Sequence, residues 1–222
     1  MFLIGQILRK GLWGMRDTDY MQLFDSRMER GSQPLSHQIA VLQGLGLTVP
    51  ENIVQEVFQK GNPPSDFGEL LAAIGVGEFD WDTGVWTPVS NQVFSFDGEV
   101  FSIENMYPNF IKGLQAISEG ELVFSDAAQD DSDVDWEAPG GIMHVSYRIN
   151  GVLCSFDAQF MGDWLDVSFQ DAVNHELEKL GVQKRFYATD GIQGNTLFFC
   201  TEEWARKFEE ATLCYMSYSG NI

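Results

Sequence analysis

The stretch IMHVSYRINGVLCSFDA, residues 142 to 158, predicts a β-hairpin with its turn at Asn150-Gly151. Asn-Gly is favoured in a type I′ turn, whose two central residues both need positive φ, and alternating apolar residues flank it on both sides. A two-residue loop sets the register of the strands. The expected apolar face pairs Ile149 with Val152, Tyr147 with Cys154, Val145 with Phe156 and Met143 with Ala158.

The other face of this hairpin is polar. It pairs Arg148 with Leu153, Ser146 with Ser155 and His144 with Asp157. An imidazole that faces a carboxylate across two strands is half of many general-base arrangements, and it is also an ordinary cross-strand polar pair. We therefore expect His144, Arg148 and Asp157 on one solvated or functional surface.

Two further hairpins are expected in the second part of the chain. One has its turn at Asp97-Gly98 and would pair Phe94 with Phe101 and Gln92 with Ile103. The other would pair residues 185–189 with 196–200 across a glycine-containing loop. A helical pattern follows each of the three hairpins, near residues 108–117, 168–180 and 201–211. This order predicts an α+β fold whose antiparallel sheet is built from three hairpin–helix units.

The first part of the chain has a helical pattern. Apolar side chains recur there at three- and four-residue steps within residues 1–30, over 33–45 and from Pro50. A capping box at Asp66 and Glu69 opens a further helix. From Glu78 onward, aromatic and β-branched residues replace the leucine-rich pattern. We therefore predict a helical N-terminal region over residues 1–77 and an α+β sheet-and-helix domain over residues 78–222.

The chain of 222 residues is strongly acidic, with 13 Lys and Arg against 33 Asp and Glu and a net charge of −20. The first 30 residues carry five positive and four negative side chains, which leaves 8 positive and 29 negative for the other 192. This balance disfavours nucleic acid and anionic membranes as direct partners, because phosphates would be repelled. It favours a basic protein partner, although acidity also serves solubility in many bacterial proteins.

The most acidic segment is SDAAQDDSDVDWEAPGG, residues 125–141, which we expect to be a solvated loop too polar to fold by itself. A tryptophan within an acidic loop is typical of a contact surface, with an aromatic anchor and a charged rim. The predicted contact residues are Asp126, Asp130, Asp131, Asp133, Asp135, Trp136 and Glu137, joined by His144, Arg148 and Asp157 of the hairpin.

Metal and cofactor motifs are incomplete. Residues 131–135 read DSDVD, like the first half of a calcium loop, but Trp136 and Ile142 stand where that loop requires glycine and glutamate. His175-Glu176 lacks the second histidine of a zinc HExxH motif. The sequence therefore predicts no metal and no cofactor.

The three cysteines show no CxxC spacing, which favours reduced thiols. The opening MFLIGQILRK has no basic region ahead of its apolar residues, and no segment approaches 18 apolar residues. We therefore expect a cytoplasmic protein without a membrane span.

Three functions are compatible with these patterns. The first is a non-enzymatic protein-binding protein, such as an intracellular inhibitor or immunity protein that covers the phosphate-binding surface of a basic toxin, for example a nuclease. The second is a small hydrolase that uses His144 and Asp157, or a carboxylate cluster around Asp80 and Asp82. The third is an adaptor that binds a partner through its N-terminal helices. The oligomeric state is not indicated by the sequence.

Overall fold

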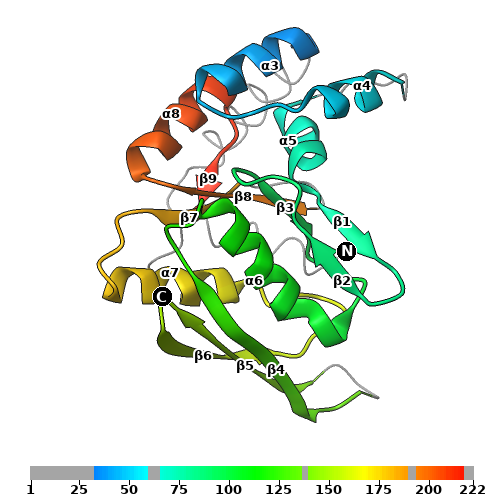
Figure 1. Cartoon of the computed structure of the whole chain (residues 1–222), viewed down its shortest axis with the longest axis vertical. Helices are drawn as coiled ribbons and strands as arrows, with labels where there is room; N and C mark the ends of the chain where they lie inside the picture. Colours follow the sequence, from blue (N-terminus) through cyan, green and yellow to red (C-terminus); the bar gives the residue numbers. More distant parts are fainter. Residues whose placement is uncertain (1–32, 60–65, 137–139, 190–193, 218–222) are drawn as a thin grey trace, which may run out of the picture.

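The computed structural model describes residues 33–59, 66–136, 140–189 and 194–217. It shows an α+β protein in which N-terminal helices precede several antiparallel sheets (Figure 1). The helices predicted within residues 1–30 lie outside the described residues.

Three helices form the N-terminal part of the described chain: α3 (Leu35–Gly44), α4 (Glu51–Gln59) and α5 (Phe67–Gly75). Their positions confirm the helices predicted from the apolar spacing. The predicted capping box is also partly visible, since the Asp66 carboxylate accepts a hydrogen bond of 2.9 Å from the Glu69 N–H. That bond satisfies one of the free donors at the start of α5.

The described residues of the later part of the chain form three separate antiparallel sheets. A two-stranded sheet pairs β1 (Glu78–Asp80) with β2 (Val85–Thr87). A four-stranded sheet has the order β3 (Phe94–Asp97), β8 (Gly194–Cys200), β7 (Arg185–Thr189) and β9 (Met216–Ser217). A three-stranded sheet has the order β4 (Phe124–Val134), β5 (Gly141–Ile149) and β6 (Val152–Gln159). The remaining helices are η1 (Ile103–Asn105), α6 (Met106–Ile117), α7 (Ser168–Lys179) and α8 (Glu202–Thr212).

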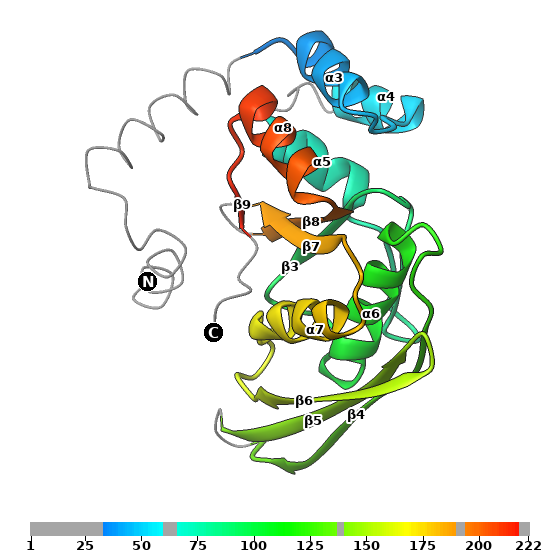
Figure 2. The same ribbon diagram turned by 90° about the vertical axis from the view of Figure 1, so that its left-hand side faces the viewer.

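The elements are stacked in layers, as Figure 2 shows. The β4–β5–β6 sheet lies at one end of the molecule, and α6 and α7 cover one of its faces. The four-stranded sheet lies on the other side of these two helices, and α5 and α8 cover its far face. Helix α3 packs beyond them, where the indole N–H of Trp204 in α8 donates to the Leu45 carbonyl at 2.9 Å.

The four-stranded sheet is buried on both faces. Phe186 and Phe199 belong to the core shared with α6 and α7, whereas Tyr187 and Phe198 belong to the core shared with α3, α5 and α8. Burial on both sides explains why β7 and β8 read as nearly continuous apolar runs rather than as alternating patterns. Each large side chain in these cores stabilises the fold by roughly 1.5–3 kcal/mol relative to an exposed position.

The central hairpin is confirmed residue for residue. Strands β5 and β6 pair with Ile149 opposite Val152 and His144 opposite Asp157, and Asn150 and Gly151 both have positive φ, as a type I′ turn requires. The hairpin of β7 and β8 is confirmed as well, although part of its predicted loop lies outside the described residues.

The hairpin predicted at Asp97-Gly98 is wrong. Strand β3 pairs with β8 instead, so that Phe94 lies opposite Leu197. This pairing leaves Phe94 only 3% exposed, while Phe101, its predicted partner, is 73% exposed. A distant strand that buries more apolar surface outweighed the local turn signal. The single sheet of three hairpin–helix units is therefore not found.

The sequence predicted a solvated loop for the acidic segment. This prediction is wrong, because most of the segment lies in β4, an edge strand. Strand β4 pairs with β5 along most of its length, and its register shifts at two irregularities, between Ser125 and Ala128 and between Asp130 and Asp133. Asp126, within the first irregularity, has φ of 54°. Such bulges accommodate extra residues in an edge strand and keep its polar side chains in solvent. Main-chain pairing to β5 therefore holds the polar residues of this segment in a strand.

Candidate functional site

The three-stranded sheet has one buried face and one open face. On β5, Met143, Val145, Tyr147 and Ile149 are buried in the main core. The alternate residues of β5 point to the opposite side, as the period of two in a strand requires. In Figure 2 the described chain lies on one side of this sheet, and no described helix or strand covers the other face.

Carboxylates from two strands gather on the open face. Asp130 of β4 and Asp157 of β6 lie on either side of His144 of β5 in the strand register. Asp133 reaches the same histidine from the second irregularity of β4. We define the acidic face by Asp126, Asp130, Asp133 and Asp157, together with the two basic side chains that contact them, His144 and Arg148.

His144 bridges all three strands. Its Nδ1 lies 2.7 Å from Asp157 Oδ1, and its Nε2 lies 3.2 Å from Asp133 Oδ2. Ionised carboxylates can only accept hydrogen bonds, so an imidazole that contacts two of them is best satisfied when both of its nitrogens carry a proton. The hydrogen bond to Asp157, followed by the one to Asp133, raises the pKa of His144 above its ordinary value.

Arg148 makes a second bridge across the acidic face. Its Nε donates to Asp126 Oδ2 at 3.0 Å, and its Nη1 donates to the Gly151 carbonyl at 2.9 Å. The Asp126 side chain remains about 70% exposed, so this ion pair is screened by solvent and contributes little stability. The pair places the Asp126 carboxylate next to the Arg148 guanidinium on this face.

Asp130 is held by its own strand. Its Oδ1 accepts a hydrogen bond of 3.0 Å from the Ser132 N–H, and this bond lowers the pKa of the Asp130 carboxyl. Asp130 is exposed, and it stays ionised at neutral pH on the open side of the sheet.

The remaining predicted contact residues are placed differently. Asp131 is half-buried in β4, and Asp135 follows the end of that strand, where its N–H donates to the Gly140 carbonyl at 3.2 Å. Trp136 is 53% exposed, and its ring packs edge-on against Phe160 with centroids 5.2 Å apart. Glu137 lies outside the described residues. The structure therefore brings five predicted acids onto or beside strand β4, and Trp136 next to its end.

The hydrolase alternative has little support in this geometry. Both nitrogens of His144 contact carboxylates, which leaves neither free to accept a proton from Ser146 or Ser155 on the same face. The Asp80 side chain stabilises a turn, because its Oδ1 accepts hydrogen bonds from the N–H groups of Asp82 and Thr83 at 2.8 and 3.2 Å. The backbone hydrogen bond from Asp82 is the main reason that the pKa of Asp80 is lowered.

The described residues contain no group of three or more His, Cys, Asp or Glu side chains arranged to hold a metal ion. Among the helices described, none is long and apolar enough to cross a membrane. Comparison with protein-family models, with curated proteins and with solved structures found no match.

The raised pKa of His144 predicts a pH-dependent stability. A raised pKa in the folded state stabilises the protonated form, so the contribution is fully present below the unfolded-state pKa of about 6.5 and is lost as pH rises through the folded-state value. The difference in the free energy of unfolding between the wild type and His144→Gln should therefore be larger at pH 6 than at pH 9. Urea unfolding at both pH values measures it.

An NMR titration of the histidine rings provides the control for this prediction. Asp157→Asn should lower the pKa of His144 more than Asp133→Asn does, because the bond to Asp157 is the shorter one. A pKa of His144 at or below 6.5 in the wild type would contradict the two-carboxylate arrangement.

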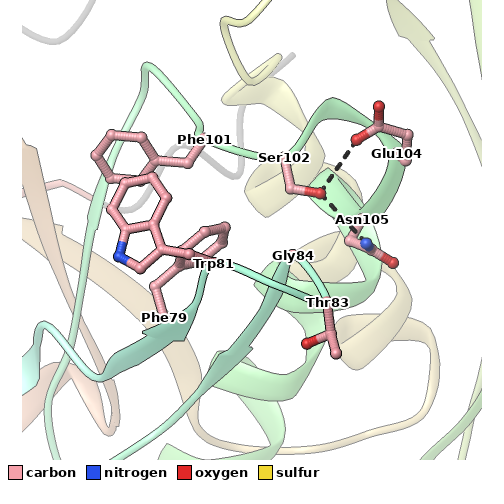
Figure 3. A pocket seen from close by; sticks show the side chains of 8 residues that line it. All are labelled: Phe79, Trp81, Thr83, Gly84, Phe101, Ser102, Glu104 and Asn105. Atoms are coloured by element: carbon pink, nitrogen blue, oxygen red, sulfur yellow. Dashed lines mark hydrogen bonds between the residues drawn. The ribbon is translucent and has the colours of Figure 1, made fainter.

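The sequence did not reveal one group of aromatic side chains that forms a second candidate site. Phe79, Trp81 and Phe101 form an aromatic cluster beside an open pocket, with Trp81 and Phe101 exposed and Phe79 half-buried (Figure 3). The sequence predicted a hairpin that pairs Phe101 with Phe94, and it indicated only a carboxylate cluster around Asp80 and Asp82. A tryptophan between two aspartates, at Asp80 and Asp82, was the only available signal.

Proposed function

We propose that this protein is a non-enzymatic binding protein that captures a basic protein through the acidic face. The observation that carries the proposal is the open side of the β4–β5–β6 sheet, where four carboxylates are held in place and no described element covers them. Asp133 and Asp157 are each about 70% exposed and available to a partner.

Electrostatics supports a basic partner. The net charge of −20 attracts cationic proteins over a distance, and the acidic face supplies the local contacts. Complementary charge of this kind accelerates association and excludes acidic competitors. Nucleic acid would be repelled by the same field.

The acidic face is the exposed side of a three-stranded sheet. An inhibitor that covers the phosphate-binding surface of a basic toxin, such as a nuclease, needs such a surface and no turnover. An intracellular immunity protein is the concrete form of this proposal. The adaptor alternative rests on residues 1–30, which lie outside the described residues.

The test begins with the tagged full-length protein as bait in lysate of its own source, washed at low and at high salt, with mass spectrometry of what is retained. The captured basic protein is then purified and its affinity measured by calorimetry. The double variant Asp130→Asn and Asp133→Asn should weaken binding about tenfold or more at low salt, because it removes two local charges.

A matched control separates local contacts from net charge. Glu202→Gln and Glu203→Gln remove the same number of charges from the exposed start of α8, which lies beyond α6, α7 and the four-stranded sheet from the acidic face. This control should bind nearly as well as the wild type. If both double variants weakened binding equally, only the long-range electrostatic field would matter, and the acidic face would not be the contact surface. If the bait retained no basic protein from the lysate, the proposal would be contradicted.

A further inference from the structure

The aromatic cluster of Phe79, Trp81 and Phe101 lies on the surface rather than in a core. Trp81 and Phe101 are each 73% exposed. The three rings contact one another, with centroids 5.0 Å apart for Phe79 and Trp81, 5.6 Å for Phe79 and Phe101, and 5.0 Å for Trp81 and Phe101. Large aromatic side chains that remain exposed together are typical of a binding surface.

A network of hydrogen bonds holds Trp81 in this exposed position. The turn that carries it is closed by Asp80, whose side chain accepts from Asp82 and Thr83 and whose carbonyl accepts from the Gly84 N–H at 2.9 Å. This turn of the β1–β2 hairpin has its own hydrogen bonds, so it does not need the tryptophan side chain to stabilise it.

The hairpin is in turn tied to the helix beneath it. Asn109 of α6 donates to the Gly84 carbonyl at 2.9 Å and accepts from the Trp86 N–H at 3.2 Å. The Trp86 indole N–H donates to the Val76 carbonyl at 2.6 Å. The exposed rings therefore sit on a rigid support, which lowers the entropy cost of binding a ligand.

The chain segment that carries Phe101 is held from the other side. Val100 donates its N–H to the Asp163 carbonyl, and Leu165 donates its N–H to the Gly98 carbonyl, both at 2.7 Å. Two independently anchored segments thus bring the aromatic side chains together.

An open pocket of about 430 Å³ lies beside the cluster. Trp81 and Phe101 form one wall, and polar residues form the other (Figure 3). On the polar wall, Ser102 donates to Glu104 Oε2 at 3.2 Å and accepts from Asn105 Nδ2 at the same distance. The exposed Glu104 carboxylate keeps acceptor capacity beyond this single bond.

The charge around the pocket selects the ligand. The residues that line the pocket include one carboxylate, Glu104, and no Lys, Arg or His. An anion would therefore be repelled there. A cation would meet aromatic ring faces on one wall and a carboxylate on the other, and both attract positive charge.

We propose that this pocket binds an arginine side chain presented by a protein or peptide. The planar guanidinium stacks on Trp81 and Phe101, and its N–H groups donate to the Glu104 carboxylate. Lysine fits less well, because its ammonium is a compact, strongly hydrated charge that cannot stack as a plane. The pocket is distinct from the acidic face, and the proposal does not depend on the function proposed for that face.

The test uses the full-length protein and the capped tripeptide Gly-Arg-Gly at millimolar concentration. NMR follows the indole N–H signals of the six tryptophans and the Gly84 amide. The Trp81 signal, assigned with Trp81→Phe, should shift saturably with the arginine peptide and less with Gly-Lys-Gly. The citrulline peptide has the same shape without the charge, and it should produce no saturable shift.

Substitutions then test each wall, with the Gly84 amide as the readout. Trp81→Ala should weaken binding about tenfold, and Glu104→Gln about threefold, since the carboxylate is solvated. Both residues are exposed, so the fold is retained, and circular dichroism verifies this. Trp136→Ala, an exposed tryptophan elsewhere in an acidic setting, should leave binding unchanged.

Three outcomes would overturn the inference. Equal shifts with the citrulline peptide would show that charge is not recognised, and unchanged affinity in Trp81→Ala would show that the cluster is not the site. A neutral oligosaccharide that shifts Trp81 while the arginine peptide does not would identify a carbohydrate site instead. The double variant Asp130→Asn and Asp133→Asn should still show the Trp81 shift with the arginine peptide. A failure of the acidic-face proposal can therefore be distinguished from a failure of this one.

Discussion

Phe169→Ala should lower the free energy of unfolding by about 3–5 kcal/mol, as truncation of a fully buried aromatic residue does. Phe169 lies on α7 and is fully buried. Its ring contacts Tyr107 and Phe110 of α6 at 5.2 and 5.8 Å, and Tyr147 and Phe156 of the central hairpin at 5.4 Å each. Removing it leaves a cavity where both helices meet the sheet.

Urea unfolding followed by circular dichroism measures this loss. The matched control is Phe101→Ala, because it makes the same chemical change at a side chain that is 73% exposed. The control should change the free energy of unfolding by no more than about 0.5 kcal/mol. Similar losses for the two variants would contradict the placement of Phe169 at the centre of the main core.

Asn174→Ala should cost about 1–3 kcal/mol, the usual penalty for leaving a buried polar group without a partner. Asn174 is fully buried on α7 and makes two hydrogen bonds of 2.8 Å to Phe186 of β7. Its Oδ1 accepts from the Phe186 N–H, and its Nδ2 donates to the Phe186 carbonyl. Alanine would leave the N–H without an acceptor inside the protein.

Gln170→Ala is the comparison for this prediction. Gln170 donates to the same Phe186 carbonyl at 2.9 Å, but Asn174 supplies that carbonyl with a second donor. The main chain of Phe186 therefore stays satisfied when Gln170 is truncated, and the loss measured by urea unfolding should be smaller than for Asn174→Ala. The opposite order would contradict the assignment of the main cost to the unsatisfied Phe186 N–H.

The same local rules explain which parts of the fold were predictable. The register of β5 and β6 follows from Asn150-Gly151 and a period of two, so a few adjacent residues contain all the information. The start of α8 is a similar case: Thr201 accepts from the Trp204 N–H at 3.3 Å, as its capping position predicts.

The candidate site was only partly predictable for the same reason. The contact of His144 with Asp157 follows from the hairpin register, because the two residues lie directly opposite each other. The contact with Asp133 depends on the pairing of β4 with β5 and on an irregularity in β4. Neither feature is accompanied by a turn motif or an apolar period in the neighbouring sequence. The sequence analysis therefore predicted a loop for the acidic segment.

By itself, then, the sequence determined the described helices, the central hairpin and the polar character of its open face. Tertiary structure alone decided that Phe94 pairs with β8 while Phe101 remains in solvent, and that the described strands form three sheets instead of one. Turns, caps and periodicity act between neighbours in the chain. Strand pairing between distant segments depends on how much apolar surface each arrangement buries, and this comparison involves the whole molecule.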